Sequence, residues 1–251
     1  MPLIKMICTN CNGYIELDSS GNHGKCTFCG TPYLYEPYEE KMKELYDESK
    51  DFQIRSGILE RYTGNISAIT IPNRVSFIAD NAFENCNGIT SVQLPNTLTQ
   101  IGENAFAGCS NLERINIPDS VKRIGYGAFS RCSSLERVIL PKGLIELGDN
   151  AFFKCISLCD VSFPDTLSII GNSTFCFCES LQEAVIPEGV QWIAWGAFSS
   201  SGLVNVSLPR SLIRIDDMAF ADCFYLRRVS NIRYVSYVSE SAFAGSPYRY
   251  H

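Results

Sequence analysis

Four cysteines near the start of the chain have the spacing of a metal site. Cys8 and Cys11 form one C-x-x-C pair, and Cys26 and Cys29 form a second pair after fourteen intervening residues. Two residues between thiolates let one tight turn present both sulfurs, so two such turns complete a closed tetrahedral site. We therefore expect these four residues to hold a structural Zn²⁺, although iron also accepts four thiolates. Four thiolates leave no open position for a catalytic water or substrate.

The segments around these cysteines predict a small β domain that positions them. "YIELD" alternates like a strand, "SSGNHG" reads as a turn, and "YLY" can form a further strand, which together resemble a zinc ribbon over residues 1–36. So short a segment buries too little surface to fold alone, and metal binding of about 10–16 kcal/mol would supply its folding energy. A thioredoxin-like redox pair is the competing interpretation of C-x-x-C, but no βαβ pattern accompanies it.

A helix is expected over residues 37–51, between this domain and the rest of the chain. Tyr38, Met42, Leu45, Tyr46 and Ser49 fall on one helical face, and Pro37 stands in the first turn. The helix either packs against the open end of the domain that follows or acts as a dimerisation or partner helix.

From residue 52 to residue 251 the sequence repeats itself. Eight phenylalanines recur every 22–23 residues, and a proline stands eleven residues before seven of them. The phenylalanines are Phe83, Phe106, Phe129, Phe152, Phe175, Phe198, Phe220 and Phe243. A fixed period in this range, built on spaced Leu residues, indicates a leucine-rich-repeat solenoid, in which each unit buries its apolar side only by stacking on its neighbours.

The repeat unit itself predicts how each turn is built. In "LERINIP", Ile115 and Ile117 alternate with polar residues as in a strand, and Pro118 ends the strand because it has no N–H to donate. The stacked strands form a parallel sheet on one face, and the short "AFxxC" segment returns on the other as a turn or helical turn, with Phe and Cys inside. We expect the repeat cysteines to be reduced, buried thiols, because Ser201 and Ser246 replace two of them.

The 23-residue unit, with "IP", "IG", "AF" and "C" at fixed places, resembles the BspA-like or Treponema-type leucine-rich-repeat family of bacterial proteins. The resemblance covers residues 52–251 and includes a capping β-hairpin over residues 52–65, "FQIRSGILERYTG", before about eight repeats. It implies a curved solenoid that binds other macromolecules and has no catalytic chemistry of its own. Many relatives are surface adhesins.

The composition of the chain limits which binding partners and which cellular compartment we expect. The formal net charge is −6, with acidic residues in excess on both sides of residue 56, so nucleic acid is an improbable ligand. No apolar run approaches the length of a membrane helix, and "MPLIKMICTNCNG" lacks the apolar core of a secretory signal. We therefore expect a cytoplasmic protein that does not insert into membranes.

Catalysis is not expected. The chain has two histidines, His23 and His251, and neither lies within the repeats next to a Ser or Cys nucleophile. No glycine-rich phosphate loop is found, because the repeated Gly follows Ile in a solenoid corner. The sequence therefore predicts neither an enzyme nor a small-molecule substrate.

Two sets of residues are candidates for binding a protein or peptide. The first is a mixed-charge stripe on the sheet face, Arg114, Arg137, Asp160 and Glu183, which either recognises a charged partner or forms solvated ion pairs. The second is Trp192 and Trp195, which stand where other repeats carry charged residues and which bind a partner or cover a neighbouring turn.

The function expected from the sequence is a non-enzymatic protein–protein interaction scaffold. The alternatives are a nucleic-acid or ribosome adaptor that works through the zinc ribbon, and a surface adhesin like many relatives.

Overall fold

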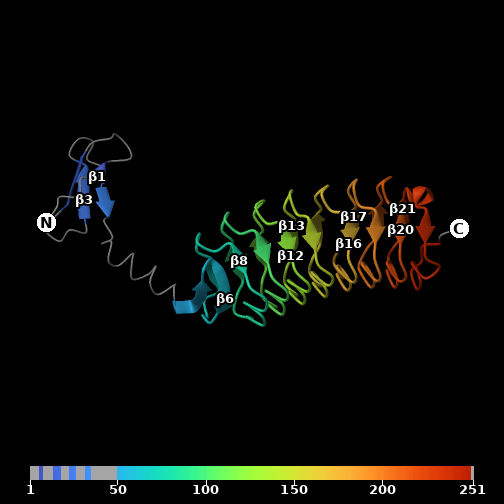
Figure 1. Cartoon of the computed structure of the whole chain (residues 1–251), viewed down its shortest axis with the longest axis horizontal. Helices are drawn as coiled ribbons and strands as arrows, with labels where there is room; N and C mark the ends of the chain where they lie inside the picture. The colour runs from blue at the N-terminus through green and yellow to red at the C-terminus, as the bar shows by residue number, and fades with distance from the viewer. Residues whose placement is uncertain (1–5, 8–13, 18–22, 27–31, 35–49, 250–251) are drawn as a thin grey trace. The chain divides into compact units, whose positions relative to one another are not determined.

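A computed structural model describes residues 6–7, 14–17, 23–26, 32–34 and 50–249 of the chain (Figure 1). The chain divides into two compact units, Met1–Asp51 and Phe52–His251. In the described part, no helix has the length and apolar character needed to cross a membrane.

The first unit contains a four-stranded antiparallel sheet in the order β1-β2-β3-β4. The strands are β1 (Met6–Ile7), β2 (Tyr14–Leu17), β3 (His23–Cys26) and β4 (Pro32–Leu34). Cys26 ends β3 opposite Ile15, whereas Cys8, Cys11 and Cys29 fall outside the described residues. Most of the expected linker helix, over residues 35–49, also falls outside them. The zinc ribbon, its metal and the helix therefore stay predictions.

The second unit begins with an antiparallel hairpin of β5 (Phe52–Arg55) and β6 (Ile58–Tyr62). Ser56 and Gly57 both have positive φ, which is the geometry of a tight two-residue hairpin turn. On its other side β6 pairs in parallel with β8 (Phe77–Ile78), so the hairpin closes the first end of the repeats.

Eight turns follow, and the prediction of a leucine-rich-repeat solenoid is confirmed. Each turn carries a three-residue strand just before its proline or the residue that replaces it. These strands pair in parallel and in register within three successive sheets, of three, two and three strands, which we together call the three-residue ladder. Its strands are β7 (Ala68–Thr70), β9 (Ser91–Gln93), β11 (Arg114–Asn116), β13 (Arg137–Ile139), β15 (Asp160–Ser162), β17 (Glu183–Val185), β19 (Asn205–Ser207) and β21 (Arg228–Ser230). The middle residue of each strand points inward and the outer two point to solvent, as the alternating sequence requires.

A second parallel sheet was not expected from the sequence. The segment that ends in "IG" forms a two-residue strand in every turn. These strands pair within two sheets, one for the first four turns together with the hairpin and one for the last four turns, and we call these strands together the two-residue ladder. They are β8, β10 (Gln100–Ile101), β12 (Arg123–Ile124), β14 (Glu146–Leu147), β16 (Ile169–Ile170), β18 (Trp192–Ile193), β20 (Arg214–Ile215) and β22 (Tyr237–Val238). Two residues are too few for a recognisable alternation, which explains why the sequence indicated only a corner here. A single 3-10 turn, η1 (Ile232–Tyr234), precedes β22.

The returning "AFxxC" segments are turns that also pair from one repeat to the next. The backbone N–H of Phe106 donates to the carbonyl of Ala128 at 2.8 Å, and the same bond recurs from Phe83 to Phe220. On all three sides of the solenoid, backbone groups therefore form hydrogen bonds from one turn to the next.

The core is a continuous column of rings and thiols. From Phe83 to Phe243, consecutive phenylalanine rings stack with centroids 4.7–5.5 Å apart. Tyr62 extends the stack into the hairpin, and Tyr248 covers its last ring. At the repeated cysteine position, Cys86 is only partly buried, whereas the later ones are buried as expected, and all are free thiols; the buried ones are Cys109, Cys132, Cys155, Cys178 and Cys223. Each donates its S–H to a phenylalanine carbonyl of the preceding turn, as Cys132 does to Phe106 at 3.2 Å.

Candidate interaction surface

The two-residue ladder presents an exposed column of two aromatic rings with an arginine between them. The column consists of Trp192 on β18, Arg214 on β20 and Tyr237 on β22. Each is the first, outward-facing residue of its strand, and the register of the strands places the three side by side. The guanidinium carbon of Arg214 lies 5.4 Å from the Trp192 ring centroid and 5.2 Å from that of Tyr237. We call these three residues the aromatic column.

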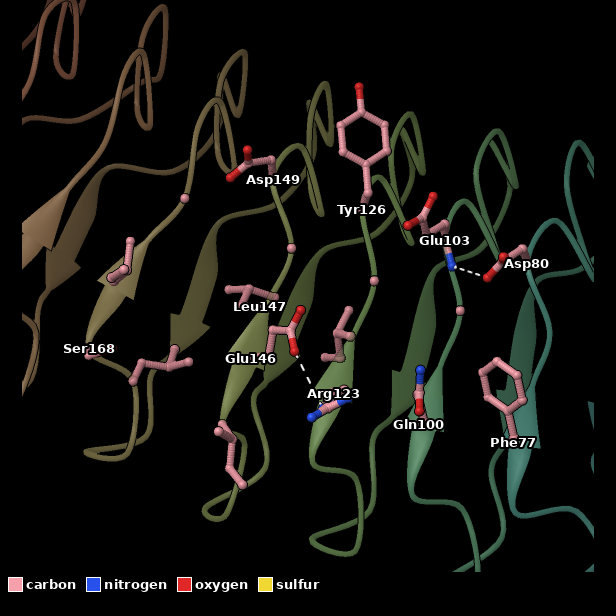
Figure 2. A pocket seen from close by; sticks show the side chains of 18 residues that line it. Phe77, Asp80, Gln100, Glu103, Arg123, Tyr126, Glu146, Leu147, Asp149 and Ser168 are labelled. Carbon is pink, nitrogen blue, oxygen red and sulfur yellow. Dashed lines mark hydrogen bonds and ion pairs between the residues drawn. The ribbon is translucent and has the colours of Figure 1, made fainter.

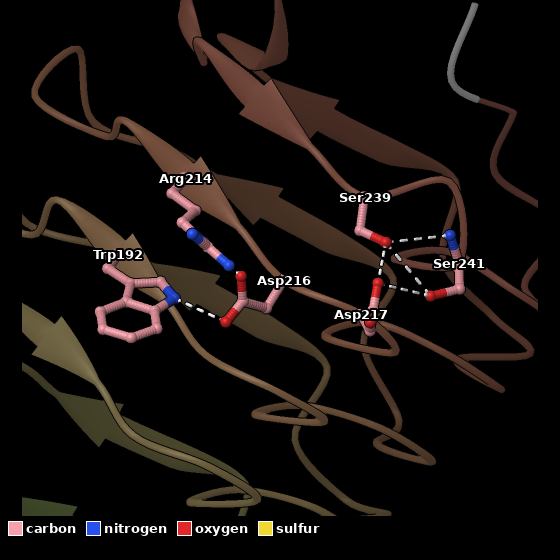
Figure 3. A network of polar contacts seen from close by, with 6 residues as sticks. All are labelled: Trp192, Arg214, Asp216, Asp217, Ser239 and Ser241. Atoms are coloured by element: carbon pink, nitrogen blue, oxygen red, sulfur yellow. Dashed lines mark hydrogen bonds and ion pairs between the residues drawn. The ribbon is translucent and has the colours of Figure 1, made fainter.

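Asp216 holds two side chains of this column, Trp192 and Arg214 (Figure 3). One carboxylate oxygen accepts a hydrogen bond from the Trp192 indole N–H at 2.9 Å, and the other accepts one from the Arg214 Nε–H at 2.5 Å. The hydrogen bond to Asp216 raises the pKa of Arg214 above its usual value, so the guanidinium stays charged. Next to it, hydrogen bonds from the Ser239 and Ser241 hydroxyls lower the pKa of Asp217. A cation held between two rings is attracted by both π-faces, so the three side chains are ordered before any ligand arrives.

Further apolar side chains surround the column. Ile169 on β16 pairs in register with Trp192, and Ile213 precedes Arg214 in the chain. Trp195 lies three residues after Trp192, in the corner that follows β18. All three side chains are exposed, and with the aromatic column they form what we call the aromatic patch. Monomeric proteins seldom expose so many large apolar groups together without using them.

A groove of about 660 Å³ continues from Ile169 along the same side toward the hairpin (Figure 2). Carboxylates dominate its polar lining, and they are partly used within the protein. Asp80 accepts the backbone N–H of Glu103 at 2.7 Å, and Glu146 pairs with Arg123 at 3.4 Å. Asp149 accepts hydrogen bonds from both the backbone and the side chain of Asn172.

The predicted charged stripe lies on the three-residue ladder, apart from the tryptophans. Arg114, Arg137, Asp160 and Glu183 are each the exposed first residue of a strand. Arg137 and Asp160 form an ion pair at 2.9 Å, whereas Glu183 accepts a hydrogen bond from Asn205 at 3.2 Å. The structure therefore brings only one predicted pair together, and it separates the two candidate sets onto different ladders.

The sequence singled out Trp192 and Trp195 but missed Arg214 and Tyr237. The signal for both was present, since each occupies the same place in its repeat as Trp192. What the repeat alone does not reveal is that three unlike side chains from consecutive turns stack on one another.

The described residues hold no group of three or more His, Cys, Asp and Glu side chains arranged to bind a metal ion. The Asp216 carboxylate accepts hydrogen bonds from Trp192 and Arg214, and the Asp217 carboxylate accepts hydrogen bonds from the hydroxyls of Ser239 and Ser241. This surface presents exposed aromatic rings and an ordered arginine, which are side chains that commonly contribute to binding.

The two ladders, the stacked phenylalanines and the outward-facing columns define a leucine-rich-repeat protein of the solenoid class. A sequence profile described as "BspA type Leucine rich repeat region (6 copies)" matches residues 53–165 and 145–250. The chain therefore belongs to the BspA-type leucine-rich-repeat family. Comparison with curated proteins finds no match.

Solved structures agree with this assignment. The chain is 32% identical to the T. pallidum leucine-rich-repeat protein TpLRR over 76% of this chain and 84% of that one, with a TM-score of 0.55. A leucine-rich-repeat protein from Eubacterium ventriosum shares the fold at 19% identity, 76% and 61% coverage and a TM-score of 0.62. The pneumococcal vaccine antigen PcpA also shares it, at 19% identity, 79% and 46% coverage and a TM-score of 0.51.

Proposed function

We propose that this protein is an interaction scaffold whose solenoid binds a protein partner through the aromatic patch. The observation that carries the proposal is the fixed stack of Trp192, Arg214 and Tyr237, which is exposed and in which Asp216 holds both Trp192 and Arg214. The leucine-rich-repeat fold, typical of non-enzymatic scaffolds, supports the same class of function.

The residue types favour a protein or peptide as the ligand. Trp, Tyr and Arg are enriched among the few residues that dominate binding energy at protein interfaces. Here their side chains are already ordered, so little conformational entropy remains to be lost on binding. The exposed Ile169, Ile213 and Trp195 around them supply the apolar rim that excludes water from such a contact.

Quantitative capture from the native organism tests this proposal. The intact chain is compared with Trp192→Ala and Tyr237→Ala variants, and Phe224→Ala is the control because Phe224 is an exposed aromatic residue outside the aromatic patch. We expect each patch variant to lose a captured protein by roughly tenfold or more, while the control retains it. Equal capture by all four chains would refute the proposal.

We also propose that Cys8, Cys11, Cys26 and Cys29 hold a structural Zn²⁺. The donor set supports this, since paired C-x-x-C thiolates suit a closed tetrahedral site. The strands β1 to β4 flank the segments that carry the cysteines, with Cys26 at the end of β3. Elemental analysis of the purified chain should find one zinc per chain, and Cys11→Ser with Cys29→Ser should remove it. Iron in its place, or a stoichiometry unchanged by the substitutions, would contradict the assignment.

We further propose that the protein acts in the cytoplasm. The eight cysteines of the repeats are all free, and Cys159 among them is exposed, which suits a reducing compartment. Cell fractionation with an antibody to the native protein tests this proposal. Recovery in the cell-surface or medium fraction would point instead to an adhesin role.

A further inference from the structure

Four exposed charged residues of the three-residue ladder are arranged symmetrically about the middle of the ladder, with positive charges on one side and negative charges on the other. Four consecutive strands, β11, β13, β15 and β17, begin with Arg114, Arg137, Asp160 and Glu183, so two positive charges are followed by two negative ones. All four side chains are exposed. The midpoint of this run lies between β13 and β15, which is also the midpoint of the eight strands from β7 to β21.

The inner pair of this run is matched within the chain, and the outer pair is not. Arg137 forms an ion pair with Asp160 at 2.9 Å, whereas neither Arg114 nor Glu183 has an ion pair among residues 50–249 and Glu183 accepts a hydrogen bond from the neutral Asn205. Arg114 and Glu183 stand three strands apart, which is about 14 Å, so they are too distant to pair with each other. On the same face Ile139 and Val185 are 58% and 68% exposed, and no other element of this unit covers them.

We propose that a second copy of this chain covers the three-residue ladder, related by a two-fold axis that runs parallel to the strands between β13 and β15. This operation places each of the first four strands of one copy opposite one of the last four strands of the second copy. Arg137 then faces Asp160 of the second copy, and Arg114 faces Glu183 of the second copy. Such a surface is complementary to itself, as an isologous dimer interface must be.

The order of charges selects this register and excludes its neighbours. An axis one strand earlier would place Arg114 against Arg137, and an axis one strand later would place Asp160 against Glu183. An axis through β13 or β15 would oppose two copies of the same charge. Each of these arrangements carries the cost of like charges in contact.

The remaining positions of the face agree with the same register. At the residue before each strand and at both exposed strand positions, no like charges meet. The pairings across the axis are Glu113 with Gln182, Glu136 with Cys159, Arg227 with Ser67, Arg228 with Ala68, Ile139 with Ser162, and Val185 with Asn116. Both exposed aliphatic side chains would thus face uncharged residues, and each charge at the other positions faces an uncharged residue rather than a like charge.

The size of the face sets the expected strength. Eight strands of three residues make a surface of about 40 Å by 10 Å per copy, which is at or below the small end of specific interfaces. We therefore expect a reversible dimer that forms with rising concentration. This dimer does not depend on the proposed role of the aromatic patch, which lies on the other ladder.

Sedimentation velocity of the full chain, from about 1 to 100 μM, tests the proposal. Arg114→Glu and Glu183→Arg should each weaken the wild-type dimer by about tenfold or more, because each places like charges across the axis. An equimolar mixture of the two variants should dimerise again, because every substituted side chain then faces its opposite on the other chain. No contact within one chain produces this rescue, given the separation of the two positions.

Arg228→Glu is the matched control. It reverses a charge in the same column of the same ladder, but it faces Ala68 across the axis and should leave the dimer unchanged. Thermal unfolding of each variant checks that the fold is intact. A wild-type chain that stays monomeric over the whole range would overturn the proposal. So would unchanged dimers of the two variants, a mixture that stays monomeric, or an equal loss in the Arg228 control.

Discussion

The interior and the exterior columns of the solenoid repeat with the same spacing but follow opposite rules. Inside, one residue type recurs, and the phenylalanine rings from Phe83 to Phe243 stack within 5.5 Å of their neighbours. Outside, the column of Trp192 changes residue type from turn to turn, from Gln100 through Arg123 and Glu146 to Tyr237. The difference shows that the buried columns define the fold, whereas the outer positions are free to acquire function.

The largest effect on stability is expected on β16, where a buried residue and an exposed residue are neighbours. Ile169 and Ile170 are adjacent on β16, and they are 42% and 0% exposed. Ile170→Asp would bury an unpaired carboxylate in the apolar core, so it should leave little folded protein. Ile169→Asp should change the free energy of unfolding by about 0.5 kcal/mol or less. Urea titration of both variants measures the contrast, and similar losses would remove the distinction between inside and outside.

Substitution of a buried repeat cysteine should lower the free energy of unfolding by a smaller amount. Cys132 donates to the Phe106 carbonyl, which also accepts the backbone N–H of Cys109. Cys132→Ala loses the weaker of these bonds and leaves a small cavity, at a cost of about 1–2 kcal/mol. Cys132→Ser should cost less than the alanine variant, because Ser201 already fills the equivalent place, with its hydroxyl 3.3 Å from Cys223 Sγ. An alanine variant as stable as wild type would show that the thiol contributes nothing.

The buried thiols should also make the free energy of unfolding fall at alkaline pH. Burial raises the pKa of Cys109 to about 12 and that of Cys223 to about 11. In the unfolded chain a thiol titrates near pH 8.5, so between that value and about pH 12 the unfolded state loses protons that the folded state keeps. The free energy of unfolding should therefore be constant up to about pH 8 and fall as the pH rises beyond it. Urea titrations at a series of pH values check this, and a slope unchanged by replacing both thiols with Ser would contradict the cause.

The smallest effect on stability is expected for the outer ion pair. Arg137 and Asp160 are 2.9 Å apart, but their side chains are 69% and 51% exposed. Their coupling energy in a double-mutant cycle should be about 0–1 kcal/mol and should shrink in high salt. The measurement is made at a concentration low enough to keep the chain monomeric. A larger coupling that ignores salt would mean that an outer column helps to define the fold.

The sequence predicted the interior better than the exterior, for a physical reason. Phe83 and its seven successors are visible as a repeat because each must fit the ring before it, and this requirement keeps the residue type constant. The two-residue ladder was missed because its strands are too short to show alternation. Arg214 and Tyr237 were missed because the stack with Trp192 depends on side chains from different turns, and no pattern within one turn records it.

The most direct test compares Phe198 and Trp192, two large aromatic residues of the same turn that are 0% and 37% exposed. The free energy of unfolding of Phe198→Ala should fall by about 3–5 kcal/mol, because the ring leaves a gap in the continuous stack. Trp192→Ala should lose about 1 kcal/mol or less, since its ring is partly exposed on the outer face of the strand, where it interacts with Arg214 and Asp216. Equal losses, or a greater loss for Trp192→Ala, would contradict the claim that one buried column supports a freely variable surface.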